Sequence, residues 1–327
     1  MGLEPVIQTG HSDSIISAYL LRGDRYIVTG SYDETAILWD AVTGYQIRKF
    51  RGHSDIITTL KPSPDGKRLI TASRDGTIKI WDIETGKEIR TIMAHTTDIL
   101  SVDVSPDNKT IVSSGSDKQV KFWDLSTGDE IETIATKPAT TRCLSYSTDG
   151  KKLACARDNW DAEIWYLTGE KKHIMLSGHR GMLNAIALSS DGTKVVTGCV
   201  DGIIKIWNVN NEAELLSINA HSSFVTSVAF NQEGTIVASA GDDGEIKLWD
   251  VSSGKLLNTL TGHTGTVRSV SFSSDGKTII SSGDDRTVRL WDIETQNERM
   301  KLSGLKYFVT DVDINKAVSL IATGSED

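Results

Sequence analysis

The segment GHSDIITTLKPSPDGKRLITASRDGTIKIWD, residues 52–82, is the unit from which the chain is built. It combines a Gly-His pair, two short apolar stretches, two Asp-Gly turns and a closing Trp-Asp. The closing tryptophan returns every 42 residues, at Trp39, Trp81, Trp123, Trp165, Trp207, Trp249 and Trp291. Histidine keeps the same period at His11, His53, His95, His179, His221 and His263. A fixed repeat of this length predicts a solenoid, a propeller or an array, because one such unit cannot bury a core alone.

The apolar residues within each unit follow the pattern of short strands. In the quoted unit they predict four strands, termed a to d, at Ile56–Leu60, Arg68–Ala72, Thr77–Trp81 and Glu88–Ile92. Asp-Gly separates a from b and Thr-Gly separates c from d, where glycine accepts a positive φ at little cost. No segment shows a helical period of useful length, so the expected fold is all-β.

Composition narrows the class of partner. The chain of 327 residues has a net charge of −9 and contains no run of Lys or Arg. We therefore expect neither a nucleic acid nor an anionic membrane as the main partner. Its cysteines, Cys143, Cys155 and Cys199, are odd in number and form no C-x-x-C pair, which predicts a reducing compartment. With no signal peptide and no apolar run of membrane-spanning length, we expect a cytoplasmic protein and a monomeric domain.

The order Gly-His, S-P-D-G and T-I-K-I-W-D at this spacing resembles the WD40 repeat, over nearly the whole chain. The near-identity of the units, with phrases such as I-W-D-I-E-T-G-K, is most similar to bacterial multi-WD40 proteins. The resemblance implies a β-propeller, a single domain over residues 1–327, with four-stranded antiparallel blades around a central channel and strand a innermost.

Two closures of the ring are open. The sequence holds seven complete repeats over residues 3–292 and a degenerate partial repeat over 293–327, with Glu298–Leu302, Phe308–Ile314 and Leu320–Ser325 as its strands d, a and b. In a seven-blade ring, Leu3–Thr9 would pair beside Thr287–Trp291. In an eight-blade ring, Phe308–Ser325 would begin a further blade that Leu3–Thr9 helps to complete. We expect seven blades, with eight as the alternative.

Four aligned positions carry groups that look catalytic. An Asp follows each His by 22 residues, a hydroxyl precedes that Asp by four, and the Trp follows it by six. The aligned sets are His11, Thr29, Asp33, Trp39; His53, Thr71, Asp75, Trp81; His95, Ser113, Asp117, Trp123; His179, Thr197, Asp201, Trp207; His221, Ser239, Asp243, Trp249; and His263, Ser281, Asp285, Trp291.

Hydroxyl, His and Asp are the parts of a hydrolase triad. Six active sites in one ring are improbable, whereas a buried indole N–H needs an acceptor that a hydroxyl, held by His and Asp, can provide. The resemblance implies the same, since these positions match the WD40 structural tetrad. We therefore expect no enzyme activity, no cofactor and no metal, with each His engaged inside its own unit.

The fourth unit departs from this pattern. Lys137, Cys155 and Asn159 replace His, hydroxyl and Asp, and only Trp165 remains, so we expect this blade to be held by packing alone. It also carries Trp160, the one tryptophan outside the repeat, in the turn between strands b and c. Trp160 is either ordinary drift in a supported repeat or part of a specialised binding patch.

The resemblance implies that partners bind the face formed by the d–a and b–c loops. The positions that vary there while the rest of the repeat agrees are the candidate partner-binding residues: Tyr32, Ile56, Arg74, Arg142, Asp158, Trp160, Met182, Phe224, Asp242, Arg268 and Asp284. Aromatic, Met and Arg side chains are enriched as anchors of protein interfaces.

The sequence is compatible with two functions. The first is a non-enzymatic scaffold that binds a peptide or protein loop on that face, with the acidic residues facing a basic residue of the partner. The second is a sensor or regulatory domain of a larger bacterial signalling enzyme, such as a caspase-like protease, a kinase or an NTPase.

Overall fold

The computed structural model describes residues 11, 13, 15–21, 26–40, 45–169, 173–273, 276–285, 287–302, 309–314 and 321–325. These residues form strands joined by turns and contain no helix, as the sequence predicts. In this part of the chain, no helix is present that is long and apolar enough to cross a membrane.

Each repeat folds into a four-stranded antiparallel sheet in which neighbours in sequence are neighbours in space. The first three sheets are β1 (Ile15–Leu21), β2 (Tyr26–Ser31), β3 (Thr35–Asp40), β4 (Gln46–Arg51); β5 (Ile57–Pro62), β6 (Arg68–Ser73), β7 (Thr77–Asp82), β8 (Glu88–Met93); and β9 (Ile99–Val104), β10 (Thr110–Gly115), β11 (Gln119–Asp124), β12 (Glu130–Ala135).

The next four are β13 (Thr141–Tyr146), β14 (Lys152–Arg157), β15 (Ala162–Tyr166), β16 (His173–Leu176); β17 (Leu183–Leu188), β18 (Lys194–Cys199), β19 (Ile203–Asn208), β20 (Ala213–Asn219); β21 (Val225–Phe230), β22 (Ile236–Gly241), β23 (Glu245–Asp250), β24 (Leu256–Thr261); and β25 (Val267–Phe272), β26 (Thr278–Gly283), β27 (Thr287–Asp292), β28 (Glu298–Leu302). The predicted strands of the second unit begin and end within two residues of β5 to β8.

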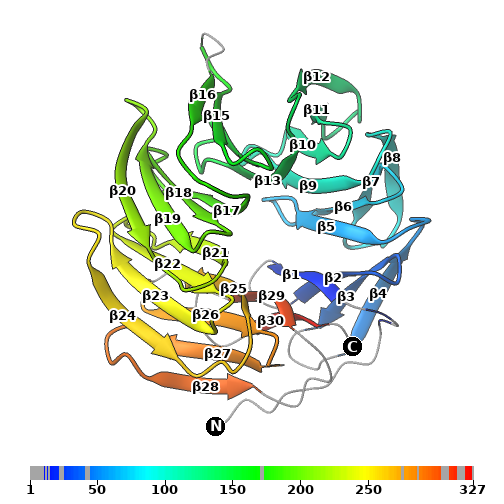
Figure 1. Ribbon diagram of the computed structural model, residues 1–327. Helices are drawn as coiled ribbons and strands as arrows, with labels where there is room; N and C mark the ends of the chain where they lie inside the picture. The colour runs from blue at the N-terminus through cyan, green and yellow to red at the C-terminus, as the bar shows by residue number, and fades with distance from the viewer. Residues whose placement is uncertain are drawn as a thin grey trace.

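The sheets stand around a ring with the first strand of each sheet innermost (Figure 1). This arrangement is a β-propeller with seven complete blades, as expected. Strands b and c are buried on both faces, because each blade lies between two others, and their apolar residues are therefore nearly continuous. The outer strand d faces solvent, and in β8 only Ile92 is buried.

The core lies between the blades. Leu38 and Phe50 of the first blade pack in one cluster with Trp81 of the second, and the Phe50 and Trp81 ring centroids are 5.7 Å apart. Trp123, Trp207, Trp249 and Trp291 likewise lie in clusters with residues of the preceding blade. The repeated tryptophan thus joins one blade to the next.

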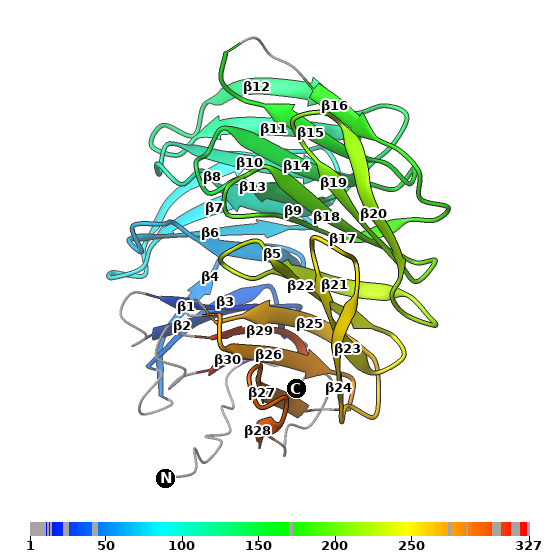
Figure 2. The same cartoon turned by 90° about the vertical axis from the view of Figure 1, so that its left-hand side faces the viewer.

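The partial repeat takes an eighth place in the ring. Its strands β29 (Val309–Ile314) and β30 (Ile321–Ser325) form a two-stranded sheet. β29 contacts β25 on one side and β1 on the other, and Figures 1 and 2 both show the pair between the seventh and first blades.

The pairing expected for a seven-blade ring is wrong in one respect. β27, which contains Thr287–Trp291, has β26 and β28 as its two sheet neighbours, so neither edge is open for another strand. The sequence allowed both arrangements because β28 and Leu3–Thr9 both fit the pattern of strand d. Leu3–Thr9 lies outside the described residues.

Candidate functional site

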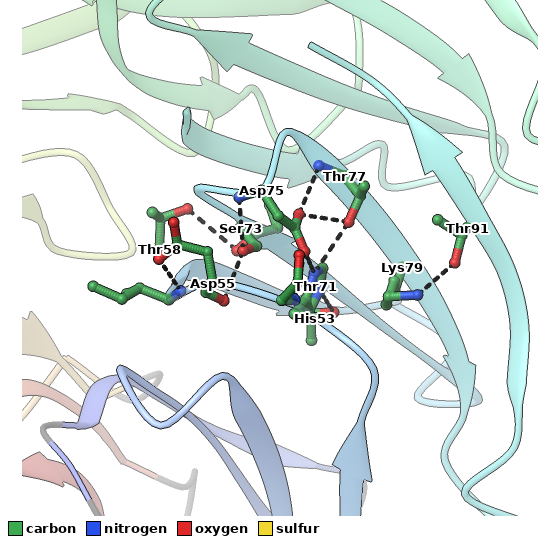
Figure 3. Close-up of polar contacts among 12 residues, drawn as sticks. His53, Asp55, Thr58, Thr71, Ser73, Asp75, Thr77, Lys79 and Thr91 are labelled. Atoms are coloured by element: carbon green, nitrogen blue, oxygen red, sulfur yellow. Dashed lines mark hydrogen bonds and ion pairs between the residues drawn. The ribbon is translucent and has the colours of Figure 1, made fainter. Parts of the chain in front are cut away.

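The second blade illustrates the tetrad, and Figure 3 shows three of its members, His53, Thr71 and Asp75. The Trp81 indole N–H donates to Thr71 Oγ1 at 2.9 Å, and Thr71 Oγ1 lies 2.8 Å from His53 Nε2. His53 Nδ1 lies 2.9 Å from Asp75 Oδ2. With Nδ1 protonated, the imidazole donates to Asp75 and accepts the Thr71 hydroxyl proton at Nε2. The chain of bonds ends at a carboxylate that also accepts the Ser54 backbone N–H at 3.0 Å.

The same bonds recur around the ring. The indole N–H donates to the hydroxyl at 2.8–3.0 Å and the hydroxyl meets His Nε2 at 2.7–2.8 Å, in the blades of Trp39, Trp81, Trp123, Trp207, Trp249 and Trp291. The distance from His Nδ1 to the Asp carboxylate is 2.8–3.0 Å in five of these blades. In the fifth blade, His179 Nδ1 and Asp201 Oδ1 are 4.0 Å apart.

Burial argues against a hydrolase triad at these positions. The hydroxyl of Thr71 is fully enclosed, and so are Ser113, Thr197, Ser239 and Ser281. Each already accepts an indole N–H, and no substrate can reach a nucleophile in that position without opening the interface between blades. Burial therefore favours a structural role for the tetrads over a catalytic one.

Two further side chains bind to the second-blade tetrad. The repeat spacing did not reveal either of them. Thr77 Oγ1 donates to Asp75 Oδ1 at 2.7 Å and lies 3.1 Å from His53 Nδ1. Ser73 Oγ donates to the Asp55 carbonyl at 2.9 Å and accepts the Asp75 N–H at 3.1 Å, which ties the b–c loop to the d–a loop (Figure 3). Thr35 and Thr287 make the same bond to the Asp of their own blades. A hydroxyl residue two positions after the Asp could therefore have predicted this contact from the sequence.

The fourth blade contains a buried ion pair instead of a tetrad. Arg157 Nη1 and Glu163 Oε2 are 3.2 Å apart, and both side chains are buried. Arg157 Nη2 also donates to the carbonyl of Thr136. The expectation that packing alone holds this blade is therefore wrong. Arg157 stands where other units have Ser, Gly or Cys, and Glu163 stands where most have Lys or Arg, and this exchange of charge was visible in the sequence.

Trp165 is supported differently from the other repeated tryptophans. Its indole Nε1 is buried without a hydrogen-bond partner, because the hydroxyl position is occupied by Cys155. Its ring stacks on His173 of β16, with centroids 4.5 Å apart and planes inclined by 23°. The stacking stabilises the ring, while the indole N–H stays without an acceptor.

The d–a and b–c loops meet on one face, joined by a backbone bond that repeats from blade to blade. The Arg74 N–H donates to the Ile56 carbonyl at 3.0 Å, and the Asp242 N–H donates to the Phe224 carbonyl at 2.9 Å. Equivalent backbone bonds join Ser116 to Asp98, Asp158 to Thr140, Val200 to Met182 and Asp284 to Thr266. The positions that we selected from the two loops are therefore brought together within each of these blades.

The candidate partner-binding residues differ in exposure. Phe224 is 52% exposed, Trp160 50%, Tyr32 40% and Met182 38%. Arg74, Arg142, Asp242 and Arg268 are also exposed, whereas Ile56, Asp158 and Asp284 are half-buried. The exposed apolar side chains Trp160, Met182 and Phe224 come from the fourth, fifth and sixth blades, which are consecutive in the ring.

Several charged candidates already have partners in the chain. Arg268 makes a bidentate contact with Asp284, with both N–O distances at 2.7 Å, and Arg74 Nε lies 3.7 Å from Asp98 Oδ2. The Asp158 carboxylate accepts the Thr140 N–H at 2.9 Å. Asp242 accepts hydroxyls from Thr266 and Ser223, which lower the pKa of its carboxyl and hold it anionic.

Trp160 has an unusual backbone conformation. Its φ is +77°, in the left-handed region that disfavours bulky residues. The equivalent positions in five other blades are Glu34, Gly76, Lys118, Gly202 and Gly244, with φ of +67°, +78°, +63°, +80° and +80°. A Cβ on Gly76 would lie 2.4 Å from the His95 carbonyl oxygen, which shows how tightly this turn is usually packed. The fourth blade therefore holds an exposed tryptophan at a turn position where these other blades have glycine, glutamate or lysine.

The first prediction concerns the tetrad. Asp75→Ala removes the acceptor of the buried His53 and is expected to lower the free energy of unfolding by roughly 1–3 kcal/mol. Asn159→Ala, at the equivalent position of the fourth blade, removes only an exposed contact to Asp161 and is expected to change it by less than about 0.5 kcal/mol. Denaturant titrations of the two variants compare them, and equal losses would contradict a structural role for the tetrad.

The second prediction concerns the ion pair of the fourth blade. Arg157→Ala leaves Glu163 buried without its cation and is expected to destabilise the protein by roughly 3–5 kcal/mol. Replacing Arg157 and Glu163 together by Met is expected to cost less than Arg157→Ala alone, because no buried charge is left unpaired. Thermal unfolding of the single and double variants measures this order, and the reverse order would contradict it.

The third prediction is acid lability. Burial lowers the pKa of His95, His221 and His263 below the ordinary value of 6.5, although Asp117, Asp243 and Asp285 act in the opposite direction. The unfolded chain therefore binds more protons than the folded one just below pH 6.5, and stability falls as the pH falls through the folded values. Denaturant titrations at pH 7.5 and 5.5 should show the lower stability at 5.5, and equal or higher stability there would contradict this account.

Comparison with known proteins agrees with this geometry. The WD domain, G-beta repeat matches residues 4–40, 44–82, 86–124, 169–208, 213–250 and 254–292 of the chain, well over half of it. The unmatched stretch 125–168 contains most of the fourth blade, where the tetrad is replaced.

Among solved structures, the crystal structure of the computationally designed Ika8 protein is similar, with a TM-score of 0.88 and 27% sequence identity over 99% of this chain and 97% of that chain. No curated protein matches the chain. The chain belongs to the WD40 repeat family, whose propellers generally serve as scaffolds for interactions between proteins.

Proposed function

We propose that this propeller is a non-enzymatic scaffold that binds a peptide or a protein loop on the face formed by its d–a and b–c loops. The observation that carries the proposal is the row of exposed Trp160, Met182 and Phe224 on consecutive blades. Large apolar side chains that stay exposed on one face mark interaction sites more often than isolated ones do.

The side chain of Trp160 strengthens the proposal. A left-handed backbone costs a residue with a Cβ about 1–2 kcal/mol relative to a right-handed one. The turn does not require tryptophan, since Gly76, Gly202 and Gly244 close the same turn elsewhere. Glu34 and Lys118 also hold this conformation, so the feature that sets Trp160 apart is its large exposed ring, and exposed tryptophans are frequent anchors of protein interfaces.

The charges beside this row suit a partner with a basic residue. Asp242 lies in the loop bonded to that of Phe224, and its carboxylate is anionic and exposed. Asp284 already binds Arg268, so of these two acids Asp242 is the one that offers an exposed charge to a partner. A basic residue of the partner, flanked by apolar side chains, would meet Asp242 and Phe224 together.

The compartment and the oligomeric state are parts of the same proposal. Cys143, Cys155 and Cys199 are all free thiols, which agrees with a reducing, cytoplasmic environment. We propose that the domain acts as a monomer, with the loop face open to its partner.

The fourth prediction separates binding from folding. Trp160→Gly relieves the left-handed strain and is expected to leave the free energy of unfolding unchanged or higher by up to about 1 kcal/mol. The same change removes an exposed anchor, so the affinity for a peptide selected on the parent protein from a random library is expected to fall at least about tenfold. Calorimetric titration gives the affinity and denaturant titration gives the stability.

Matched variants complete this experiment. Met182→Ala with Phe224→Ala is expected to weaken the same peptide without unfolding the chain. Leu257→Ala is the control, because Leu257 is 48% exposed but lies on the outer strand β24. Full affinity in the Trp160 and Met182–Phe224 variants, or a loss in the Leu257 variant alone, would place binding elsewhere.

A further inference from the structure

The fifth blade differs from the other blades with tetrads at the contact between His and Asp. His179 Nδ1 is 4.0 Å from Asp201 Oδ1 and has no hydrogen-bond partner, although the His179 side chain is 0% exposed. Among the tetrads of the described residues, this is the one buried imidazole nitrogen left unpaired. His179 is thus engaged within its own unit through Nε2 alone, and its Nδ1 is left without a partner.

A thiol lies at the same place. Cys199 is buried, and its Sγ, His179 Nδ1 and a carboxylate oxygen of Asp201 all lie within 4.8 Å of one another. In the second blade the position of Cys199 is held by Ser73, and there Nδ1 of the histidine is bonded to its Asp. The open nitrogen and the thiol thus occur together in one blade.

The hydrogen bonds around His179 leave Nδ1 available as a ligand. Nε2 lies 2.7 Å from Thr197 Oγ1, and the Thr197 hydroxyl lies 3.4 Å from the Lys205 carbonyl, to which it can donate. Thr197 then accepts the Nε2 proton of His179, which places the lone pair on Nδ1. A ligating histidine is usually held in this way, through its other ring nitrogen.

The carboxylate is also held and has a path to solvent. Asp201 accepts the Arg180 N–H at Oδ2 and the Ile203 N–H at Oδ1, at 3.3 and 3.0 Å, and its side chain is 18% exposed. The exposed part of Asp201 therefore opens this cluster of side chains to solvent at the loop face. Lys205, the nearby cation, is engaged by Glu214 at 2.7 Å.

We propose that His179, Cys199 and Asp201 form a binding site for Zn²⁺ or a similar divalent transition metal, with water as the fourth ligand. Nitrogen, thiolate and carboxylate are the ligand types that Zn²⁺ takes, with bonds of about 2.0–2.3 Å. Ligand atoms in a tetrahedral site with bonds of that length lie roughly 3.5 Å from one another. The three ligand atoms, which lie within 4.8 Å of one another, would therefore move together by about 1 Å on binding the ion. The thiol proton leaves to solvent as the metal binds.

A redox role for the thiol is the competing explanation. Burial raises the pKa of the Cys199 thiol to about 12, and reactive cysteines are those with lowered values and open surroundings. Gly181 also covers it, since a Cβ on that residue would lie 3.3 Å from Cys199 Sγ. The enclosed thiol is therefore a poor target for a soluble oxidant, and it would act as a ligand only when a bound metal displaces its proton.

Cobalt titration tests the site on the full chain, kept reduced and freed of metal by a chelator. Co²⁺ is expected to bind with one equivalent and to give the sulfur-to-cobalt charge-transfer band and the visible bands of a tetrahedral ion, which Zn²⁺ then abolishes. Zn²⁺ is also expected to raise the Tm of the parent. Absence of the charge-transfer band would overturn the proposal.

Three variants assign the ligands. Cys199→Ser is expected to lose the charge-transfer band and the shift in Tm, and it should fold because Ser73 holds the same position in the second blade. Asp201→Asn is expected to bind Co²⁺ at least about tenfold more weakly, because even the loss of a group that only supports a metal ligand costs about that much affinity. Cys143→Ser keeps Cys199 and is expected to keep the band. A band that persists in Cys199→Ser, or that disappears in Cys143→Ser, would overturn the assignment.

Discussion

The buried indole N–H of the repeated tryptophan is the group around which each blade with a tetrad is arranged. Trp81 packs against Phe50 of the preceding blade, so its ring is enclosed on both sides and its N–H cannot reach water. A buried donor without an acceptor costs about 1–3 kcal/mol. Thr71, His53 and Asp75 carry the bond outwards in three steps to a carboxylate at the loop face. The tetrad therefore couples packing between blades to the position of the loops.

That coupling explains why much of the fold follows from the sequence. The seven blades, their strands and the tetrads depend on residues that recur at fixed spacing, and the repetition makes each unit a test of the others. The fourth blade could not be derived in this way, because Arg157 and Glu163 occur once and their pairing depends on which strands face each other. The position of β28 was equally hidden, since two segments of the chain fitted the same strand.

The loop face is predictable in its location but not in which of its side chains are exposed. The ladder of bonds between Phe224 and Asp242 and its equivalents follows from the hairpin geometry that every blade shares. The left-handed φ of the b–c turn recurs as well, with glutamate, glycine, lysine or tryptophan at that position, but the sequence does not show which of these side chains stay exposed. Likewise, no spacing distinguishes Asp284, which Arg268 occupies, from Asp242, which keeps an exposed charge.

The two blades that depart most from the repeat are neighbours, and they depart in different parts of the tetrad. In the fourth blade, the tetrad is replaced by a buried ion pair, and Trp160 is exposed at the b–c turn. In the fifth, Thr197 still accepts the Trp207 indole N–H, so the buried donor stays satisfied when His179 and Asp201 separate. The outer half of the tetrad can thus change its chemistry while the inner half keeps the blade folded. Function in a repeat of this kind can arise wherever a blade has a second means of support.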